Sequence, residues 1–260
     1  MESSDIANFI TSTVRQAGAM AKEAFGLVDV SYKKSDVPFD VFTKTDGDID
    51  AYIKSAIRAK FPLHAICSEE GDELRDSPYT WTIDPIDGSS NFSRGIPHFA
   101  VCLGLLEEGV PVCGAVYNPM TDEFFSFEQG KGAMLNEQRL HVSTKEALAG
   151  GVAFLTIGSR AENWPWGLAL YNGFLHAECR VRTMAASALD VCYLAAGRVD
   201  VVVYGGVGIH DIAPAVGVLR EAGGDVYGFE TGERALLTKK PQRIVATGTS
   251  ELAAFVRSLT

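Results

Sequence analysis

Residues 84–92 of this 260-residue chain read Asp-Pro-Ile-Asp-Gly-Ser-Ser-Asn-Phe, and they indicate both its fold and its chemistry. The apolar run 80–83 just before them is typical of a buried strand, which would carry two aspartates at its end. Pro85 is expected to stop the strand because proline donates no ladder hydrogen bond, and Gly88 lets the backbone approach a ligand closely. If a helix begins at residues 89–91, its first N–H groups have no internal partners and suit a phosphate.

Two further acidic features extend this site. Glu69 ends an earlier strand-like run, and Asp211 begins a helix directly after the glycine-rich residues 205–208. Carboxylates repel a phosphate unless cations lie between them, and oxygen ligands suit hard cations such as Mg²⁺. With Asp84 and Asp87, these residues supply enough carboxylates for two metal ions that share one ligand. Such pairs activate a water on one ion and stabilise the leaving oxygen through the other.

The composition excludes several other classes of protein. A hydrophobic content of 47% is ordinary for a globular domain, and a formal net charge of −10 opposes a broad grip on nucleic acid polymers or anionic membranes. The five cysteines form no C-x-x-C pair and fit no complete disulfide framework. The first residues are acidic where a secretory signal would be basic, and no apolar stretch is long enough to span a bilayer. We therefore expect a cytoplasmic protein with reduced thiols.

Hydrophobic spacing predicts two halves of different character. Helices are expected from the N-terminus to near Gly26 and from near Asp46 to before Pro62, followed by an antiparallel meander of strands at 98–106, 111–117, 123–127 and 132–135. The second half alternates between strands near 152–157, 178–181, 199–204 and 244–247 and helices near 166–174, 186–196 and 211–222, with a last helix capped by Ser250. This predicts one unit of 1–260 with an N-terminal α+β lobe (about 1–145) and a C-terminal α/β lobe (about 146–260).

Taken in order, these motifs resemble the inositol monophosphatase family over essentially the whole chain. Residues 84–92 match the signature D-P-[IVL]-D-G-[TS]-[TS]-N-F of that family. Further matches are V-T-x-x-D at 43–46, [GS]-E-E at 68–70, G-A-x-x-N…V-S at 132–143, S-A-A-L-D…A-x-G-R-x-D at 188–200 and W-D-x-A…E-A-G-G at 211–224. The resemblance implies a layered αβαβα sandwich of the sugar-phosphatase type, usually dimeric and often lithium-sensitive.

The same resemblance implies roles for particular residues. Two Mg²⁺ ions would be bound by Glu69, Asp84, the carbonyl of Ile86, Asp87 and Asp211, and a third would be shared by Glu69 and Glu70 through water. Asp46 and the Ser89 hydroxyl would position and deprotonate the attacking water, with Glu69 as a third catalytic residue. The phosphate would lie on the backbone N–H groups of Gly88 and Ser89, and the substrate would be contacted by Asp87, Gly88, Ser89, Ala188 and Asp211.

These expectations lead to one function with named alternatives. The first is Mg²⁺-dependent hydrolysis of inositol monophosphate or a similar small polyol phosphate by a homodimer. Related families with the same metal motifs act on fructose 1,6-bisphosphate, histidinol phosphate or 3′-phosphoadenosine 5′-phosphate. The rival of a different class is a non-catalytic, metal-binding regulatory protein, which is expected to have lost part of the site. Substrate choice is assigned to the segments 159–166 and 204–210.

Several residues depart from the family pattern or carry an isolated signal. Tyr204 stands near a position where inositol-preferring members carry a glutamate, and His210 replaces the usual tryptophan before Asp211, where we expect it to pack beside the aspartate. Cys192 and Arg198 fit the C-x₅-R spacing of cysteine phosphatases, but Cys192 lies in an apolar helical pattern and is predicted to be core. Asp48 and Asp50 are expected to face solvent. Residues 164–166, Trp-Pro-Trp, are interpreted as a packed loop or dimer contact, with a substrate clamp as the alternative.

Overall fold

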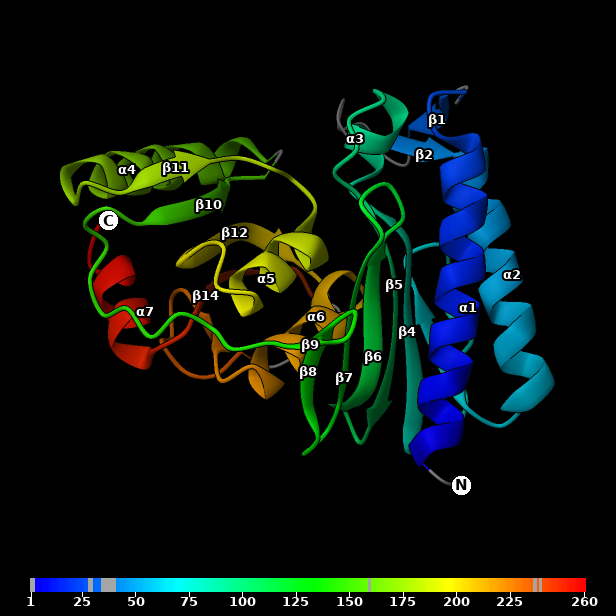
Figure 1. The fold of residues 1–260 in the computed structure, drawn as a ribbon. Helices are drawn as coiled ribbons and strands as arrows, with labels where there is room; N and C mark the ends of the chain where they lie inside the picture. Colours follow the sequence, from blue (N-terminus) through cyan, green and yellow to red (C-terminus); the bar gives the residue numbers. More distant parts are fainter. Residues whose placement is uncertain (1–2, 28–29, 34–40, 159, 236–237, 239) are drawn as a thin grey trace.

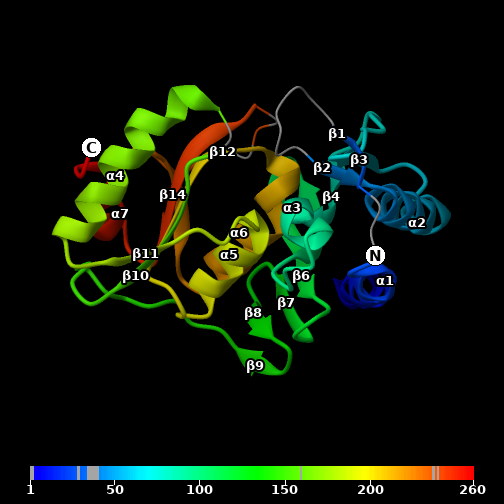
Figure 2. The same ribbon diagram turned by 90° about the horizontal axis from the view of Figure 1, so that it is seen from above.

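Helices and sheets alternate as layers in the computed structural model, which describes residues 3–27, 30–33, 41–158, 160–235, 238 and 240–260 (Figure 1). Helices α1 (Ser3–Ala24) and α2 (Lys44–Lys60) cover one face of a seven-stranded sheet. Helices α5 (Ser187–Ala195) and α6 (Ile209–Glu221) pack between this sheet and a five-stranded sheet, whose outer face is covered by α4 (Trp164–His176) and α7 (Ser250–Arg257). The view from above shows the same order (Figure 2), and the predicted αβαβα sandwich is confirmed.

The seven-stranded sheet contains the predicted meander. Its order is β3 (Ala65–Ser68), β4 (Tyr79–Asp87), β5 (Ala100–Glu107), β6 (Val110–Asn118), β7 (Glu123–Glu128), β8 (Gly132–Leu135) and β9 (Gln138–Arg139). The pair β3–β4 is parallel, and each later neighbour is antiparallel. The prediction that Pro85 stops the strand is wrong, because β4 continues to Asp87. A register shift against β5 between Asp84 and Asp87 accommodates the missing N–H of the proline.

The five-stranded sheet is mixed. Its order is β11 (Arg180–Arg182), β10 (Val152–Thr156), β12 (Val201–Val207), β14 (Gln242–Thr247) and β13 (Asp225–Gly228). The strand β10 runs parallel to β11 and β12, as the alternating pattern predicts, whereas β14 is antiparallel to both of its neighbours. The sequence analysis missed β13, the short hairpin of β1 (Val30–Lys33) and β2 (Val41–Thr43), the edge strand β9, and the 3₁₀ helix η1 (Ala161–Asn163). The division into two lobes near residue 145 stays a prediction.

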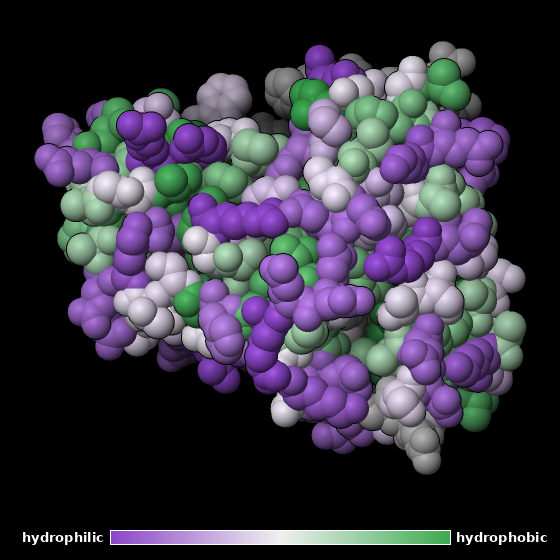
Figure 3. Space-filling view, viewed as in Figure 1, coloured by the Kyte–Doolittle hydropathy of each residue, from purple (hydrophilic) through white to green (hydrophobic). Residues whose placement is uncertain are grey.

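Buried apolar faces hold the layers together. On α1, the residues at helical spacing, Ile10, Val14, Ala17 and Ala21, are all buried against the seven-stranded sheet. The helices α5 and α6 fill the space between the sheets with small and branched side chains. This middle layer therefore packs against strands from both halves of the chain. The face seen in Figure 3 is largely hydrophilic, in keeping with the high charge. None of the described helices combines the length and apolar character that a membrane crossing needs.

Two local predictions are wrong. Asp50 does not face solvent: it is 7% exposed, and its carboxylate accepts hydrogen bonds from Lys54 Nζ and Ser68 Oγ, both at 2.5 Å. Asp48 is exposed as expected. The final helix is capped by Thr249 and not by Ser250, because the Thr249 hydroxyl accepts a hydrogen bond from the N–H of Leu252 at 3.2 Å.

Candidate active site

A cleft of about 880 Å³ opens where β4, β10 and β12 end and where the short helix α3 (Ser89–Ser93) and α6 begin. Strand ends from both sheets therefore contribute to its walls, with α3 at the upper centre of Figure 1. Most of the residues that the sequence analysis singled out meet here: Glu69, Asp84, Ile86, Asp87, Gly88, Ser89 and Asp211 all line the cleft. They come from five different elements or connections, so the chain assembles the site only by folding.

Asp84 is the centre of the acidic group. It is 3% exposed, and its Oδ1 has no hydrogen-bond partner. Burial raises the pKa of Asp84 well above its usual range, and repulsion from Glu69, Asp87, Asp211 and Asp46 raises it further. An unpaired buried carboxylate oxygen is costly unless a cation pairs with it.

The donors around Asp84 fit a hard cation. They are carboxylate and carbonyl oxygens, the ligands that Mg²⁺ prefers. Within the described part of the chain, no three His, Cys, Asp or Glu side chains already lie at the spacing of a formed metal site. Glu69, Asp87 and Asp211 nevertheless lie near enough to Asp84 for their repulsion to raise its pKa. The cleft thus holds a set of donors that a cation would draw together.

Asp87 connects the seven-stranded sheet to the middle helix layer. Its Oδ1 accepts a hydrogen bond from the Ser187 hydroxyl at 3.1 Å, and its Oδ2 accepts one from the N–H of Leu189 at 2.9 Å. Burial raises the pKa of Asp87 to about 7, although the hydrogen bonds from the start of α5 act in the opposite direction. The carboxylate is therefore oriented by residues a hundred positions away in the sequence.

Asp46 accepts hydrogen bonds from two hydroxyl side chains, those of Thr43 and Ser89, of which Ser89 was predicted to act with it. It is fully buried in the first turn of α2, where its Oδ2 accepts a hydrogen bond from the N–H of Thr43 at 2.9 Å and another from the Thr43 hydroxyl. This reciprocal contact is a capping box. The Ser89 hydroxyl lies 3.1 Å from Asp46 Oδ1 and 2.8 Å from the carbonyl oxygen of Ile86. Asp46 and Ser89, 43 residues apart, thus form the pair that the sequence analysis proposed.

Gly88 and α3 give the cleft a backbone surface. Gly88 has φ +89°, and a Cβ there would lie 3.1 Å from both the carbonyl oxygen of His98 and the Cβ of Ala186, so only glycine fits. In the first turn of α3, the N–H groups of Asn91 and Phe92 donate to the carbonyl oxygen of Gly88, whereas those of Ser89 and Ser90 have no acceptor within the helix. The side-chain amide of Asn91 donates to the carbonyl oxygens of His98 and Met184, both at 2.8 Å, and so fixes α3 against both halves of the molecule.

Three predicted residues, Ala188, Glu70 and the buried Asp46, are absent from the lining of the cleft. Ala188 does not line the cleft: its side chain is fully buried in the core, and the residues of this segment that reach the cleft are Ala185 and Ser187. Glu70, assigned to a third metal ion, is likewise absent from the lining residues. Asp211 does line the cleft, and its Oδ2 accepts a hydrogen bond from the N–H of Gly208 at 2.7 Å.

A buried network that the sequence analysis missed adjoins the cleft. The Tyr204 hydroxyl donates to Asp190 Oδ2 at 2.5 Å, and the Nε2 of His98 lies 2.8 Å from Asp190 Oδ1. Tyr204 thus directs its hydroxyl to a carboxylate of the protein. His98 gave no signal because its partner lies 92 residues away. The side chain of His210 and residue Ser159 lie outside the described residues.

The cysteine prediction is confirmed. Cys192 is fully buried in the core cluster, and burial raises the pKa of its thiol well above the usual range. A protonated, inaccessible thiol is no nucleophile.

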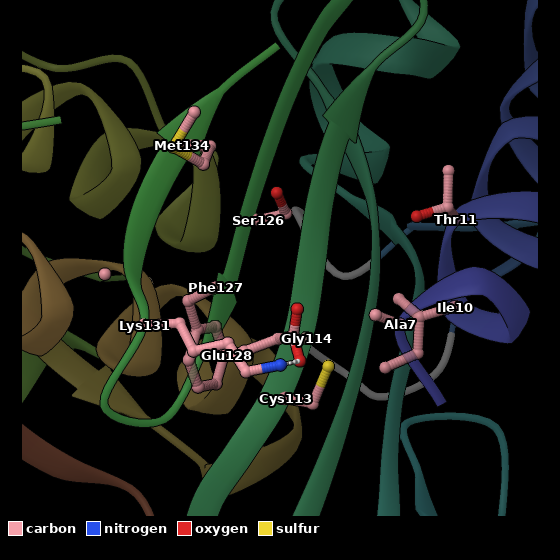
Figure 4. Close-up of a pocket in the computed structure, with 11 residues that line it drawn as sticks. Ala7, Ile10, Thr11, Cys113, Gly114, Ser126, Phe127, Glu128, Lys131 and Met134 are labelled. Atoms are coloured by element: carbon pink, nitrogen blue, oxygen red, sulfur yellow. Dashed lines mark hydrogen bonds and ion pairs between the residues drawn. The ribbon is translucent and has the colours of Figure 1, made fainter. Parts of the chain in front are cut away.

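A second, smaller cavity of about 240 Å³ lies between α1 and the strands β6, β7 and β8 (Figure 4). Its lining is mostly small or apolar, and its charged pair, Lys131 and Glu128, is closed by an ion pair at 2.6 Å. The thiol of Cys113 at its base has a pKa raised to about 12 by burial. This cavity therefore offers no reactive group, and the cleft is the candidate active site.

Comparison with known proteins gives one family. The model of the inositol monophosphatase family matches residues 2–259. Nus factor SuhB of Pasteurella multocida is 36% identical over 234 residues, which cover 88% of this chain and 87% of that protein. Inositol-1-monophosphatase of Rhizobium meliloti is 32% identical over 243 residues, which cover 91% of this chain and 90% of that protein.

Solved structures agree with this result. The extragenic suppressor protein suhB of Bartonella henselae superposes with a TM-score of 0.90 at 29% identity, covering 98% of both chains. An inositol monophosphatase from Anabaena superposes with a TM-score of 0.84 at 30% identity, covering 98% of this chain and 95% of that one. The similarity extends over the whole fold, including both walls of the cleft.

Proposed function

The chain belongs to the inositol monophosphatase family, and on that premise we propose that it is a Mg²⁺-dependent phosphomonoesterase for small phosphorylated polyols such as inositol monophosphate. The observation that carries the proposal is the buried Asp84, whose Oδ1 has no partner and which lies within the electrostatic field of Glu69 and Asp87. A phosphate ester could approach this acidic wall only with cations between them. The cleft supplies the oxygen donors that such cations need.

The residues divide into metal ligands and water-positioning groups. Glu69, Asp84, the carbonyl of Ile86, Asp87 and Asp211 would hold two Mg²⁺ ions, and the water-mediated third ion at Glu69 and Glu70 remains part of the proposal. When bound, these ions neutralise the charge of the phosphate and make a water molecule nucleophilic near neutral pH.

The side chains of this protein then orient the reactants. Asp46 accepts a hydrogen bond from the Ser89 hydroxyl, which leaves the Ser89 oxygen as an acceptor for the attacking water. The water's proton would pass toward this Asp46–Ser89 pair, assisted by Glu69, as general-base catalysis requires. The N–H groups of Gly88 and Ser89 would hold the phosphate, with Asp87 and Asp211 beside it.

Relatives support a phosphatase, whereas the substrate stays a proposal. The Rhizobium meliloti relative carries the name inositol-1-monophosphatase. Fructose 1,6-bisphosphate, histidinol phosphate and 3′-phosphoadenosine 5′-phosphate remain the alternatives within the superfamily. The second candidate function is a non-catalytic regulatory role, favoured by the name Nus factor that the Pasteurella multocida relative carries. We prefer the enzyme because the carboxylates and the Asp46–Ser89 pair are all in place.

We also propose a cytoplasmic homodimer. Leu168, Tyr171 and Leu175 are 64%, 43% and 51% exposed on one face of α4, at the spacing of a single helical stripe. A second copy that covers this stripe would remove it from water. Replacing Leu168 and Leu175 by lysine is expected to halve the mass measured by light scattering, and an unchanged mass would place the interface elsewhere.

Phosphate release tests the proposed function. The purified protein is offered inositol 1-phosphate and the three alternative substrates with Mg²⁺, with EDTA, and with Mg²⁺ plus lithium. We expect Mg²⁺-dependent release that EDTA abolishes and lithium reduces. Release that resists EDTA would contradict the metal-dependent mechanism, and no release from any substrate in a folded sample would favour the regulatory role.

A further inference from the structure

Part of the lining of the cleft, here called the outer wall, has a chemistry unlike that of the carboxylates. This outer wall consists of residues from the end of β10 to the start of α4 and from the connection before α5: Thr156, Ile157, Gly158, Arg160, Trp164 and Thr183. It contains no carboxylate, and Arg160 is the one cation among the described residues that line the cleft. A neutral polyol would need no cation there.

The guanidinium of Arg160 is exposed and can bind an anionic group of a substrate. Its side chain is 65% exposed, and the carboxylate of Glu162 stands 3.8 Å from its Nη1, itself 71% exposed. Exposed pairs at such a distance contribute little, because water screens them and holding both side chains costs entropy. A guanidinium binds a phosphate or carboxylate through two parallel hydrogen bonds and would exchange this neighbour for such a ligand.

Trp164 places an aromatic surface beside that cation. It is 52% exposed and lines the cleft at the first turn of α4. Trp166, two residues later, is already packed, with its ring at 4.9 Å from that of Phe229 and at 4.8 Å from the guanidinium of Arg243. Of the two tryptophans, only Trp164 therefore has a ring face free for a substrate.

Tyr204 also lines the cleft, and its side chain offers a polyol no free hydroxyl donor. Because its hydroxyl donates to Asp190, that hydrogen is not available to a substrate hydroxyl. The volume of about 880 Å³ is near the upper end for small-molecule sites and leaves room beyond a monophosphorylated six-carbon ring. A substrate that spans the cleft would reach from Asp84 to Arg160.

Resting on the proposed function, we propose that the cleft selects phosphomonoesters that carry a second anionic group, bound by Arg160 at the far end while Trp164 packs against the body of the substrate. The scissile phosphate lies at the carboxylate wall, and the second group is a phosphate or a carboxylate. This assigns Arg160 and Trp164 as specificity-determining residues. It also ranks the bisphosphates above inositol monophosphate.

Matched substrates test this inference. Fructose 1,6-bisphosphate is compared with fructose 1-phosphate, and 3′-phosphoadenosine 5′-phosphate with adenosine 3′-phosphate, at saturating Mg²⁺. Within each pair, the two compounds differ by the second phosphate alone. For at least one pair, we expect the wild-type kcat/KM to be higher for the bisphosphate by about 10- to 100-fold, the range of a charge-assisted hydrogen bond.

Variants assign that preference to the outer wall. Arg160→Gln is expected to lower the bisphosphate-to-monophosphate ratio of kcat/KM by the same factor, mainly through KM, and Arg160→Lys to restore part of it. Trp164→Ala should raise KM for both members of a pair, whereas Trp164→Phe should not. Arg75→Gln is the matched control, because it removes one positive charge from an exposed residue at the opposite end of β4 and should leave the ratio unchanged.

The outcomes separate the two proposals. A wild-type ratio near one for both pairs, or a ratio that Arg160→Gln leaves unchanged, overturns the inference while the phosphatase function stands. An equal loss in Arg75→Gln would also overturn it, because the effect would then come from net charge. Absence of Mg²⁺-dependent release from all four compounds and from inositol 1-phosphate would overturn the proposed function itself.

Discussion

The two walls of the cleft are built in opposite ways. The carboxylate wall is formed by Glu69, Asp84, Asp87 and Asp211. Hydrogen bonds from Ser187 and Leu189 orient Asp87, and one from the N–H of Gly208 orients Asp211. The outer wall instead presents exposed side chains, with Arg160 and Trp164 held by few contacts. The residues that would perform the chemistry are thus fixed by burial, whereas those that would select the substrate are exposed and can change their contacts when a substrate binds.

Burial also determines what a substitution would cost. A change in the carboxylate wall disturbs charges in a medium of low effective dielectric, where each interaction is strong. A change in the outer wall alters contacts with water and with the substrate. Effects on turnover should therefore be large at the first wall, and effects on selectivity should dominate at the second.

The largest effect is expected for Asp87→Asn. The substitution removes a negative charge from a proposed metal ligand but keeps the size of the side chain and its contacts with Ser187 and Leu189. Turnover should fall by about 10³-fold or more. Phosphate release measures the loss, and circular dichroism checks that the fold persists. The exposed Asp48→Asn on α2 serves as the control, and near wild-type activity of Asp87→Asn would remove this residue from the mechanism.

A second large effect is expected for Ser89→Ala. Asp46 would lose one of its two hydroxyl partners, and the attacking water would lose its orienting group, so kcat should fall by about 10²- to 10⁴-fold. Ser89→Thr keeps the hydroxyl and should retain most of the rate. If alanine and threonine were equally active, the hydroxyl would have no part in the reaction.

Asp84→Asn tests the electrostatic basis of the carboxylate wall without an activity assay. Without added metal, the free energy of unfolding of this variant should exceed that of the wild type by on the order of 2 kcal/mol, because a buried carboxylate with an unpaired oxygen is removed. Denaturant unfolding measures the difference. Added Mg²⁺ should then stabilise the wild type and not the variant. Equal Mg²⁺ stabilisation of both proteins would show that the ion binds elsewhere.

The smallest effect on turnover is expected for Cys192→Ser. The thiol lies in the core behind the cleft, so the serine variant should lose stability, by about 1–2 kcal/mol, and keep its kcat. Thermal unfolding and phosphate release on the same sample separate the two effects. An inactive but fully folded variant would instead place the thiol in the chemistry.

Much of the carboxylate wall could be predicted because its residues form short motifs. The spacing of Asp84 and Asp87, the glycine after them and the acidic starts of later elements carry a chemical meaning that does not depend on distant contacts. The layered fold followed in the same way from alternating helical and strand periodicity, although short elements such as β13 offered too few residues for a pattern. Of the residues that received a role from the family resemblance, all except Asp46, Glu70 and Ala188 line the cleft, and their roles stay predictions.

The order of the longer elements and the identity of the acidic residues could be predicted from the sequence alone, because periodicity and motif spacing are local properties. Tertiary packing, in contrast, buries Asp50 against Ser68, brings the Tyr204 hydroxyl to Asp190, and places Arg160 in the same cleft as the carboxylates. These contacts join residues that lie far apart in the chain, and no local pattern encodes them. Burial and hydrogen bonding of a side chain depend on which surfaces the packed layers bring together.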